Sequence, residues 1–188
     1  AVGPVDVVLL TVKLYDVVSA AKQIIPMLKP ETAVVALQNG VESPDILKST
    51  IDPKHVMAGS IYIPSKIGDP GVIIHDGGFA RVVFGELDGL RSNRAEALLN
   101  LFQHAGVDVE VTGNVVSALW TKFIMLSAVS ATTAITRGPI GPVRNDPDMR
   151  AMLIAAMRET EAVGRAKGVD LEENIFDTLL AQAHDFPS

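Results

Sequence analysis

The chain has 188 residues, 48% of them hydrophobic and 20% charged, which is enough to bury the core of one large or two small domains. Its formal net charge of -6 argues against a nucleic-acid-binding protein, and no cluster of lysine and arginine contradicts this. It has no cysteine, which excludes disulfides and thiolate metal sites and is compatible with the cytoplasmic location that we expect.

The first part of the chain alternates apolar runs with helical patterns. Residues 5–12 (VDVVLLTV) form a continuous β-branched run, typical of a parallel strand covered on both faces. Residues 16–28 carry a helical apolar stripe that Pro30 ends, and residues 32–37 (TAVVAL) form a second strand. Residues 42–50 complete a strand–helix–strand–helix pattern, which predicts a right-handed parallel unit of a doubly wound sheet.

Two polar residues follow these strands. Lys13 comes after the first strand and Asn39, with Gly40, after the second, so both are expected at the carboxyl edge of the sheet, where ligands bind in open α/β folds. Each also has an ordinary interpretation, Lys13 as a solvated loop cation and Asn39-Gly40 as a turn that tolerates positive φ. Their shared location favours a binding role.

Beyond Pro53 the pattern changes to short strands with tight connections. The turn signal Asp76-Gly77-Gly78 predicts that the strands on either side of it pair antiparallel as a hairpin. The sheet therefore gains an antiparallel edge. The predicted elements here are strands at 55–63, 71–75, 80–86 and 107–111 and an amphipathic helix at 92–104.

The longest apolar stretch, residues 117–135 (SALWTKFIMLSAVSATTAI), has Lys122 as its only charged residue. Apolar residues fall on every side, as in a helix buried all round. Its serines and threonines, together with Lys122, make it too polar for a membrane span, so we predict no membrane contact. Burying an ammonium is costly and lowers its pKa. Lys122 is therefore either a snorkelling lysine whose head reaches water or a proton donor in an active site.

Helical patterns continue at 147–167 and 171–183. We predict an α/β Rossmann-like portion, partial and with an antiparallel edge, over residues 1–112, followed by an all-α domain over residues 113–188. The four histidines have no metal-ligand spacing and no Gly-x-Ser-x-Gly elbow is present, so we expect neither a metal site nor a serine hydrolase.

Three motifs in this order give the chain a resemblance to a known family: Val12-Lys13, Gln38-Asn39-Gly40 and Trp120-x-Lys122. Thr133-Ala134 and the segment from Glu159 to Gly168 fit the same pattern, which resembles ketopantoate reductase, also called 2-dehydropantoate 2-reductase. The resemblance implies a Rossmann domain that binds NADP(H), a helical domain that helps to hold a 2-keto acid, and a role as an oxidoreductase of pantothenate biosynthesis. It also allows a homodimer through the helical domain.

The resemblance assigns roles to individual residues. Lys122 matches the catalytic lysine, a general acid that stabilises and protonates the oxygen of the reduced ketone. Asn39 matches an asparagine beside substrate and nicotinamide, which makes it both catalytic and cofactor-binding. Lys122, Leu126 and Ser130 would line the substrate. The cofactor-binding residues implied are Lys13, Asn39, Gly40, Gly59 and Ser60.

Three departures from the family pattern change what we expect. The glycine-rich turn G-x-G-x-x-G is absent, and the chain stops before the family's C-terminal serine and acidic residues, so we expect a middle portion that is inactive alone. Leu126 and Ser130 stand where the family places asparagines, which predicts a more apolar substrate than ketopantoate.

Two other functions remain open from the sequence. One is a non-catalytic helical module that uses the Lys122 helix to bury a partner or dimer surface. The other is a related hydroxyacid dehydrogenase with a different substrate. A glycine-rich turn directly before Ala1 in the gene would favour an enzyme over the module.

Overall fold

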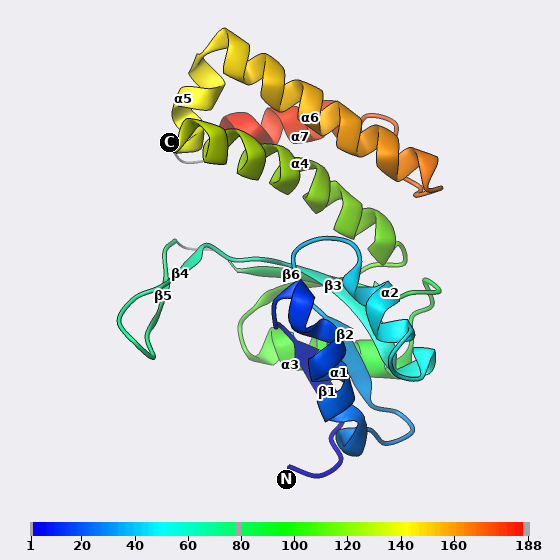
Figure 1. Cartoon of the computed structure of the whole chain (residues 1–188). Helices are drawn as coiled ribbons and strands as arrows, with labels where there is room; N and C mark the ends of the chain where they lie inside the picture. Colours follow the sequence, from blue (N-terminus) through cyan, green and yellow to red (C-terminus); the bar gives the residue numbers. More distant parts are fainter. Residues whose placement is uncertain (1, 78–79, 186–188) are drawn as a thin grey trace. The chain divides into compact units, whose positions relative to one another are not determined.

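The computed structural model describes residues 2–77 and 80–185 (Figure 1). Its internal contacts divide the chain into two units, Ala1–Ala118 and Leu119–Ser188, and each is described by itself. The division predicted at residues 112–113, with its functional assignment, stays a prediction.

A five-stranded sheet in the order β1-β2-β3-β6-β7 organises the first unit. The strands β1, β2 and β3 run parallel, β6 runs antiparallel to β3, and β7 runs parallel to β6. This confirms the predicted Rossmann-like sheet with an antiparallel edge. The strands are β1 (Val7–Leu10), β2 (Ala33–Ala36), β3 (Val56–Tyr62), β6 (Arg81–Glu86) and β7 (Asp108–Val111).

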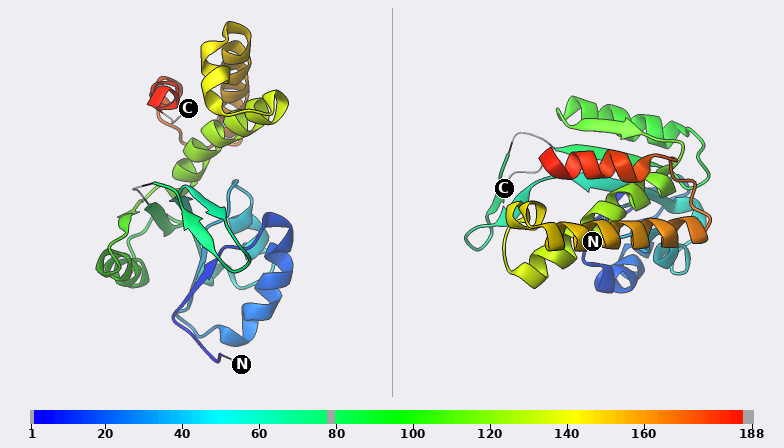
Figure 2. Two further views of the ribbon diagram at one scale, coloured as in Figure 1. Left: turned by 90° about the vertical axis from the view of Figure 1, so that its left-hand side faces the viewer. Right: turned by 90° about the horizontal axis from the view of Figure 1, so that it is seen from above.

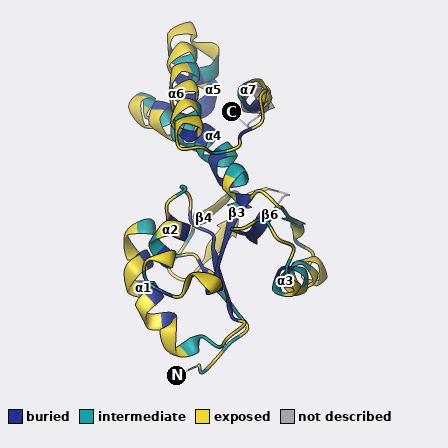
Figure 3. Cartoon of the chain, turned by 90° about the vertical axis from the view of Figure 1, so that its right-hand side faces the viewer, coloured by how far each residue is buried: buried dark blue, intermediate teal, exposed yellow. Residues whose placement is uncertain are grey.

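Helices cover both faces of this sheet, with α3 (green) on one side and α1 and α2 on the other (Figure 2, left). Side chains alternate between the faces. Val34 and Ala36 of β2 pack in the cluster that contains α1 residues, and Ala33, Val35 and Leu37 pack in the cluster that contains α3 residues. All four β2 residues are buried, and the central strands appear dark blue in Figure 3. The helices are α1 (Val17–Ile24), α2 (Ser43–Lys48) and α3 (Asn93–His104), with short 3-10 turns at Leu14–Asp16, Ile25–Met27 and Pro53–His55.

The strand β1 lies at one edge of the sheet, and its Leu9 side chain is 45% exposed. No strand pairs with its outer edge within residues 2–77 and 80–185. The first strand was predicted to be covered on both faces, and it is covered only in part.

The predicted hairpin is wrong. The strand β5 (Ile73–His75) pairs with β4 (Ser65–Ile67), not with β6, and the two form a separate exposed ribbon that extends from the sheet (Figure 1). Their turn uses Gly71 at φ +85 and a hydrogen bond from Gly68 N–H to Val72 O of 3.0 Å. β6 instead pairs with β3, because Val82 and Phe84 are buried there in the core on the α3 side. Part of the predicted turn, Gly78, lies outside the described residues.

The second unit is helical. The helix α4 is long and apolar enough to cross a membrane by length and composition alone, but one of its faces packs as a core helix, with Ile124 and Ala128 fully buried. Ile135, by contrast, is 63% exposed, so α4 is not buried on every side as predicted. The short α5 was not predicted, and α7 begins four residues later than the pattern suggested. The helices are α4 (Val115–Thr136), α5 (Ile140–Asn145), α6 (Pro147–Ala166) and α7 (Ile175–Asp185).

Close contacts join α4 to α6. A Cβ added at Gly164 would lie 2.9 Å from Trp120 Cε3, so the glycine allows α6 to approach the indole. The Ser127 and Thr160 hydroxyls lie 3.2 Å apart and share a hydrogen bond. These contacts fix one face of α4 within the second unit.

Candidate functional site

The carboxyl edge of the parallel strands carries Lys13 and Asn39. β1 and β2 pair from Val7 and Ala33 onward, and Leu37 N–H donates to Leu10 O at 3.0 Å, so the two strands end side by side. Lys13 and Asn39 both follow these ends and are exposed. The sheet therefore brings both to the edge where ligands bind in this class of fold, as predicted from the strand pattern.

Gly40 shapes the turn after Asn39. Its φ of +98 lies in the left-handed region, where a side chain is strained even though no atom lies within 4 Å of an added Cβ. The turn thus depends on glycine for its backbone conformation and not for space.

Gly59 and Ser60 lie in β3, beside the end of β2. A Cβ at Gly59 would lie 2.8 Å from Leu37 Cδ2 and 3.0 Å from Phe84 Cβ, so the strand needs glycine here for close packing. Ser60 is buried, and its Oγ makes no hydrogen bond of ordinary geometry. Burial raises the pKa of Tyr62, two residues further along β3, and the nearby Ser60 hydroxyl counteracts this.

One buried polar residue of this region was not among the predicted site residues. Gln38 is 7% exposed, and neither polar atom of its amide has a hydrogen-bond partner. A signal was available: Gln38 continues the alternation of Val34 and Ala36 on a buried face, where a polar side chain is unexpected.

The second group of predicted site residues lies on α4. Lys122, Leu126 and Ser130 follow one another at intervals of one helical turn, so they share a face of the helix. Lys122 and Leu126 are half-buried and Ser130 is exposed. Burial lowers the pKa of Lys122, because it disfavours the charged ammonium. The carboxyl edge belongs to the first unit and this face of α4 to the second.

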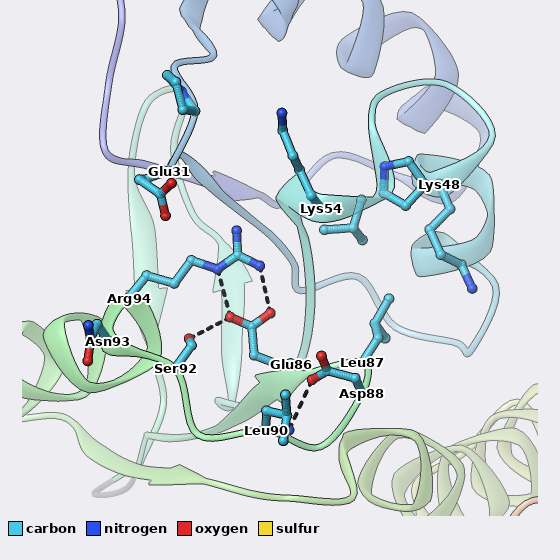
Figure 4. Close-up of a pocket in the computed structure, with 13 residues that line it drawn as sticks. Glu31, Lys48, Lys54, Glu86, Leu87, Asp88, Leu90, Ser92, Asn93 and Arg94 are labelled. Carbon is cyan, nitrogen blue, oxygen red and sulfur yellow. Dashed lines mark hydrogen bonds and ion pairs between the residues drawn. The ribbon is translucent and has the colours of Figure 1, made fainter.

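A pocket of about 660 Å³ lies elsewhere, at the amino ends of β2 and β3 (Figure 4). Arg94 points at Glu86 and binds its carboxylate through two hydrogen bonds of 2.7 and 2.6 Å, and Ser92 adds a third of 2.6 Å. The ammonium groups of Lys48 and Lys54 lie away from this carboxylate and pair with aspartates. The pocket contains none of the predicted site residues, and its buried charges satisfy one another.

Comparisons with known proteins identify the family. A family model described as ketopantoate reductase PanE/ApbA matches residues 1–89, and the model of its C-terminal part matches residues 114–187. The chain belongs to the ketopantoate reductase family. This confirms the resemblance seen in the three short motifs.

Curated proteins resemble the chain over nearly its whole length. It is 29% identical to 2-dehydropantoate 2-reductase of Caulobacter vibrioides, over 96% of this chain and 60% of that protein. It is 26% identical to the uncharacterized oxidoreductase YkpB of Bacillus subtilis, over 99% of this chain and 63% of that protein. The chain therefore spans about 60% of the length of these relatives.

Solved structures show the same architecture. A PanE/ApbA family ketopantoate reductase from Ralstonia eutropha JMP134 is 34% identical with a TM-score of 0.85, over 99% of this chain and 60% of that one. A 2-dehydropantoate 2-reductase from Geobacter metallireducens GS-15 is 25% identical with a TM-score of 0.88, over 99% and 64%. These likenesses confirm the predicted fold class, a Rossmann-like portion followed by a helical domain.

Proposed function

We propose that the intact protein carrying this chain reduces a 2-keto acid with NADPH, as in the conversion of 2-dehydropantoate to pantoate. Membership of the ketopantoate reductase family supports a reductase, and the Caulobacter relative is named for this reaction. The observation that carries the proposal is Lys122, a half-buried lysine with a lowered pKa in the segment that matches the family's C-terminal model. The predicted cytoplasmic location and homodimer stay predictions.

The residues at the carboxyl edge fit the nicotinamide end of such a cofactor. Lys13 and Asn39 are exposed there, and the enclosed polar atoms of Gln38 and Ser60 lack partners that a polar ligand group could provide. When bound, the cofactor supplies the hydride. No G-x-G-x-x-G turn is present in residues 1–188, so no residue of the chain is assigned to the pyrophosphate.

Lys122 provides the acid of the reaction. Reduction of a ketone carbonyl places negative charge on its oxygen, and a cationic Nζ stabilises that charge and then donates its proton to form the hydroxyl. Lys122 is left neutral and regains a proton from water. The lowered pKa assists this step, because the ammonium gives up its proton more easily than an exposed lysine would.

The test is Lys122→Ala in the intact protein. We expect kcat to fall by roughly 10²–10⁴-fold, the usual contribution of positioned acid–base catalysis, with KM little changed. Steady-state kinetics with NADPH and ketopantoate measure both constants. Lys22→Ala removes an exposed lysine from α1 and is the matched control, expected to leave both constants unchanged. Near-normal turnover of Lys122→Ala would mean that the lysine only snorkels.

We further propose that the substrate is more apolar than ketopantoate on the side that faces Leu126. A substrate hydroxyl buried against Leu126 would lack a partner at a cost of about 1–3 kcal/mol, or roughly 5–150-fold in kcat/KM. The hydroxyl of Ser130, one turn further along α4, could recover part of this loss.

A panel of branched 2-keto acids with and without the hydroxyl measures this preference. Leu126→Asn should raise kcat/KM for ketopantoate relative to its deoxy analogue, whereas Leu101→Asn, at an exposed leucine of α3, should not. If the unmodified protein already prefers ketopantoate and Leu126→Asn brings no improvement, this assignment of the α4 face is wrong.

A further inference from the structure

Three polar side-chain atoms in the described ranges, 2–77 and 80–185, are buried without a hydrogen-bond partner. They are Nε2 and Oε1 of Gln38 and Oγ of Ser60. Gln38 is 7% exposed and Ser60 is 2% exposed, so bulk water does not satisfy them. Folded proteins pair the great majority of such groups, which makes the two unpaired atoms of the Gln38 amide informative, whereas the Ser60 hydroxyl lies close enough to Tyr62 to counteract the rise in the pKa of that phenol.

The sheet places these two residues together. Gln38 and Ser60 each follow the paired residues Ala36 and Ala58 by two positions, and the same parallel register carried that far sets Gln38 beside Ser60. The Leu37 side chain lies against Gly59, so the chains are still adjacent at this level. By alternation from Ala36 and Ala58, both polar side chains face the same side of the sheet.

The chemistry of the Gln38 amide defines what would satisfy it. An amide offers N–H donors on one atom and an acceptor on the other. A primary carboxamide is a neutral group that pairs with both at once, donating to Oε1 and accepting from Nε2. The Ser60 hydroxyl, which can donate or accept, is placed to make a further contact.

The position is also suited to a ligand. Gln38 directly precedes Asn39, which is exposed at the carboxyl edge, and a glutamine side chain has several rotatable single bonds. We propose that Gln38, assisted by Ser60, binds the carboxamide of the nicotinamide ring. This inference rests on the proposed function, since the cofactor of that reaction carries this group.

Binding measurements separate the carboxamide contact from the rest of the cofactor. Calorimetry compares NADP⁺ with its 3-acetylpyridine analogue, which keeps the carbonyl acceptor but has a methyl group in place of the amide nitrogen. In the intact protein we expect NADP⁺ to bind about 5–10-fold more tightly, the worth of one hydrogen bond. In Gln38→Leu that ratio should fall toward one, and in Ser60→Ala it should fall in part. Gln103→Leu, at an exposed glutamine of α3, is the matched control and should keep the full ratio.

Stability of the ligand-free protein provides a second readout. Because the amide has no partner without ligand, Gln38→Leu should raise the Tm of the ligand-free protein, whereas Gln103→Leu should leave it unchanged. If Gln38→Leu fails to fold, Gln38→Met, which is similar in volume and equally apolar, replaces it in both assays.

The outcomes distinguish this inference from the proposed function. An unchanged ratio in the Gln38 variant, in a protein that binds NADP⁺ and reduces a 2-keto acid, overturns the inference and leaves the function standing. A lower Tm of the ligand-free variant shows that the amide already has a partner, and also overturns it. Failure of the unmodified protein to bind either nucleotide rejects both.

Discussion

The Glu86–Arg94 pair offers a direct measure of what holds the first unit together. Glu86 ends β6 and is 7% exposed, and it accepts three hydrogen bonds from Ser92 and Arg94. Ser92 also caps α3, since its Oγ accepts from Ala95 N–H at 3.1 Å. The carboxylate therefore joins the end of a strand to the start of the helix that covers it.

Replacing Glu86 by leucine should destabilise the protein substantially. Removing one member of a buried ion pair costs about 3–5 kcal/mol, because the other charge stays buried without its partner. The Arg94 side chain is 21% exposed, so water solvates it in part and we expect the lower end, about 3 kcal/mol. For a protein of this size that corresponds to a fall of roughly 6–12 °C in Tm.

Urea unfolding of the intact protein followed by far-UV circular dichroism measures this change. Fluorescence of Trp120 would not serve, because this residue belongs to the second unit. Adding Arg94→Leu to Glu86→Leu should restore stability to within about 1 kcal/mol of the unmodified protein, since no unpaired charge is left. Lys48→Leu breaks an exposed ion pair of the same pocket and should cost no more than about 1 kcal/mol. A loss below about 1 kcal/mol for Glu86→Leu would refute the reasoning, because that is the cost of a surface pair. So would a double variant as unstable as the single one.

Two further predictions concern the second unit. Lys122→Met keeps the buried stem without the charge, so it should raise the free energy of unfolding at neutral pH while abolishing most activity. This gain in the free energy of unfolding should shrink toward about pH 10, because the unfolded state of the unmodified protein then binds more protons than its folded state, and the unmodified protein becomes more stable. Urea unfolding at neutral pH and at about pH 10 measures the gain. A gain that is the same at both pH values contradicts the prediction. Gly164→Ala should lower the free energy of unfolding by about 1 kcal/mol and shift Trp120 fluorescence. A Cβ 2.9 Å from the indole ring forces a rearrangement that costs about 1–3 kcal/mol. The higher helix propensity of alanine offsets only part of this cost. An unchanged spectrum with a higher Tm would show that α6 has room there.

Local sequence patterns were sufficient to predict which residues lie at the carboxyl edge of the sheet. Consecutive apolar residues such as those around Val34 are satisfied only in a strand buried on both faces, and β2 is buried in this way. The residue types after such strands then have to lie at the sheet edge, which is why Lys13 and Asn39 could be assigned before the structure. Their roles toward a ligand stay predictions.

Local sequence patterns could not predict which strands pair with one another. The glycines after Asp76 signal a turn, but pairing depends on which strand offers a free edge beside an apolar surface, and β3 offers that to β6. The importance of Glu86 and Gln38 was hidden for a similar reason. Each is a polar residue that faces the same side of the sheet as buried apolar neighbours. Only the structure shows that Glu86 accepts three hydrogen bonds and that the Gln38 amide has no hydrogen-bond partner.

The unpaired outer edge of β1 affects how residues 1–188 behave in solution when they are expressed alone. Leu9 is 45% exposed on a strand whose outer side has no partner strand within the described part of the chain. Unpaired backbone groups on an apolar, β-branched strand are a template on which another strand can add. Residues 1–188 expressed alone should therefore self-associate through β1 as protein concentration rises. A lysine in place of Leu9 should reduce that association, because charged side chains on edge strands discourage edge-to-edge pairing.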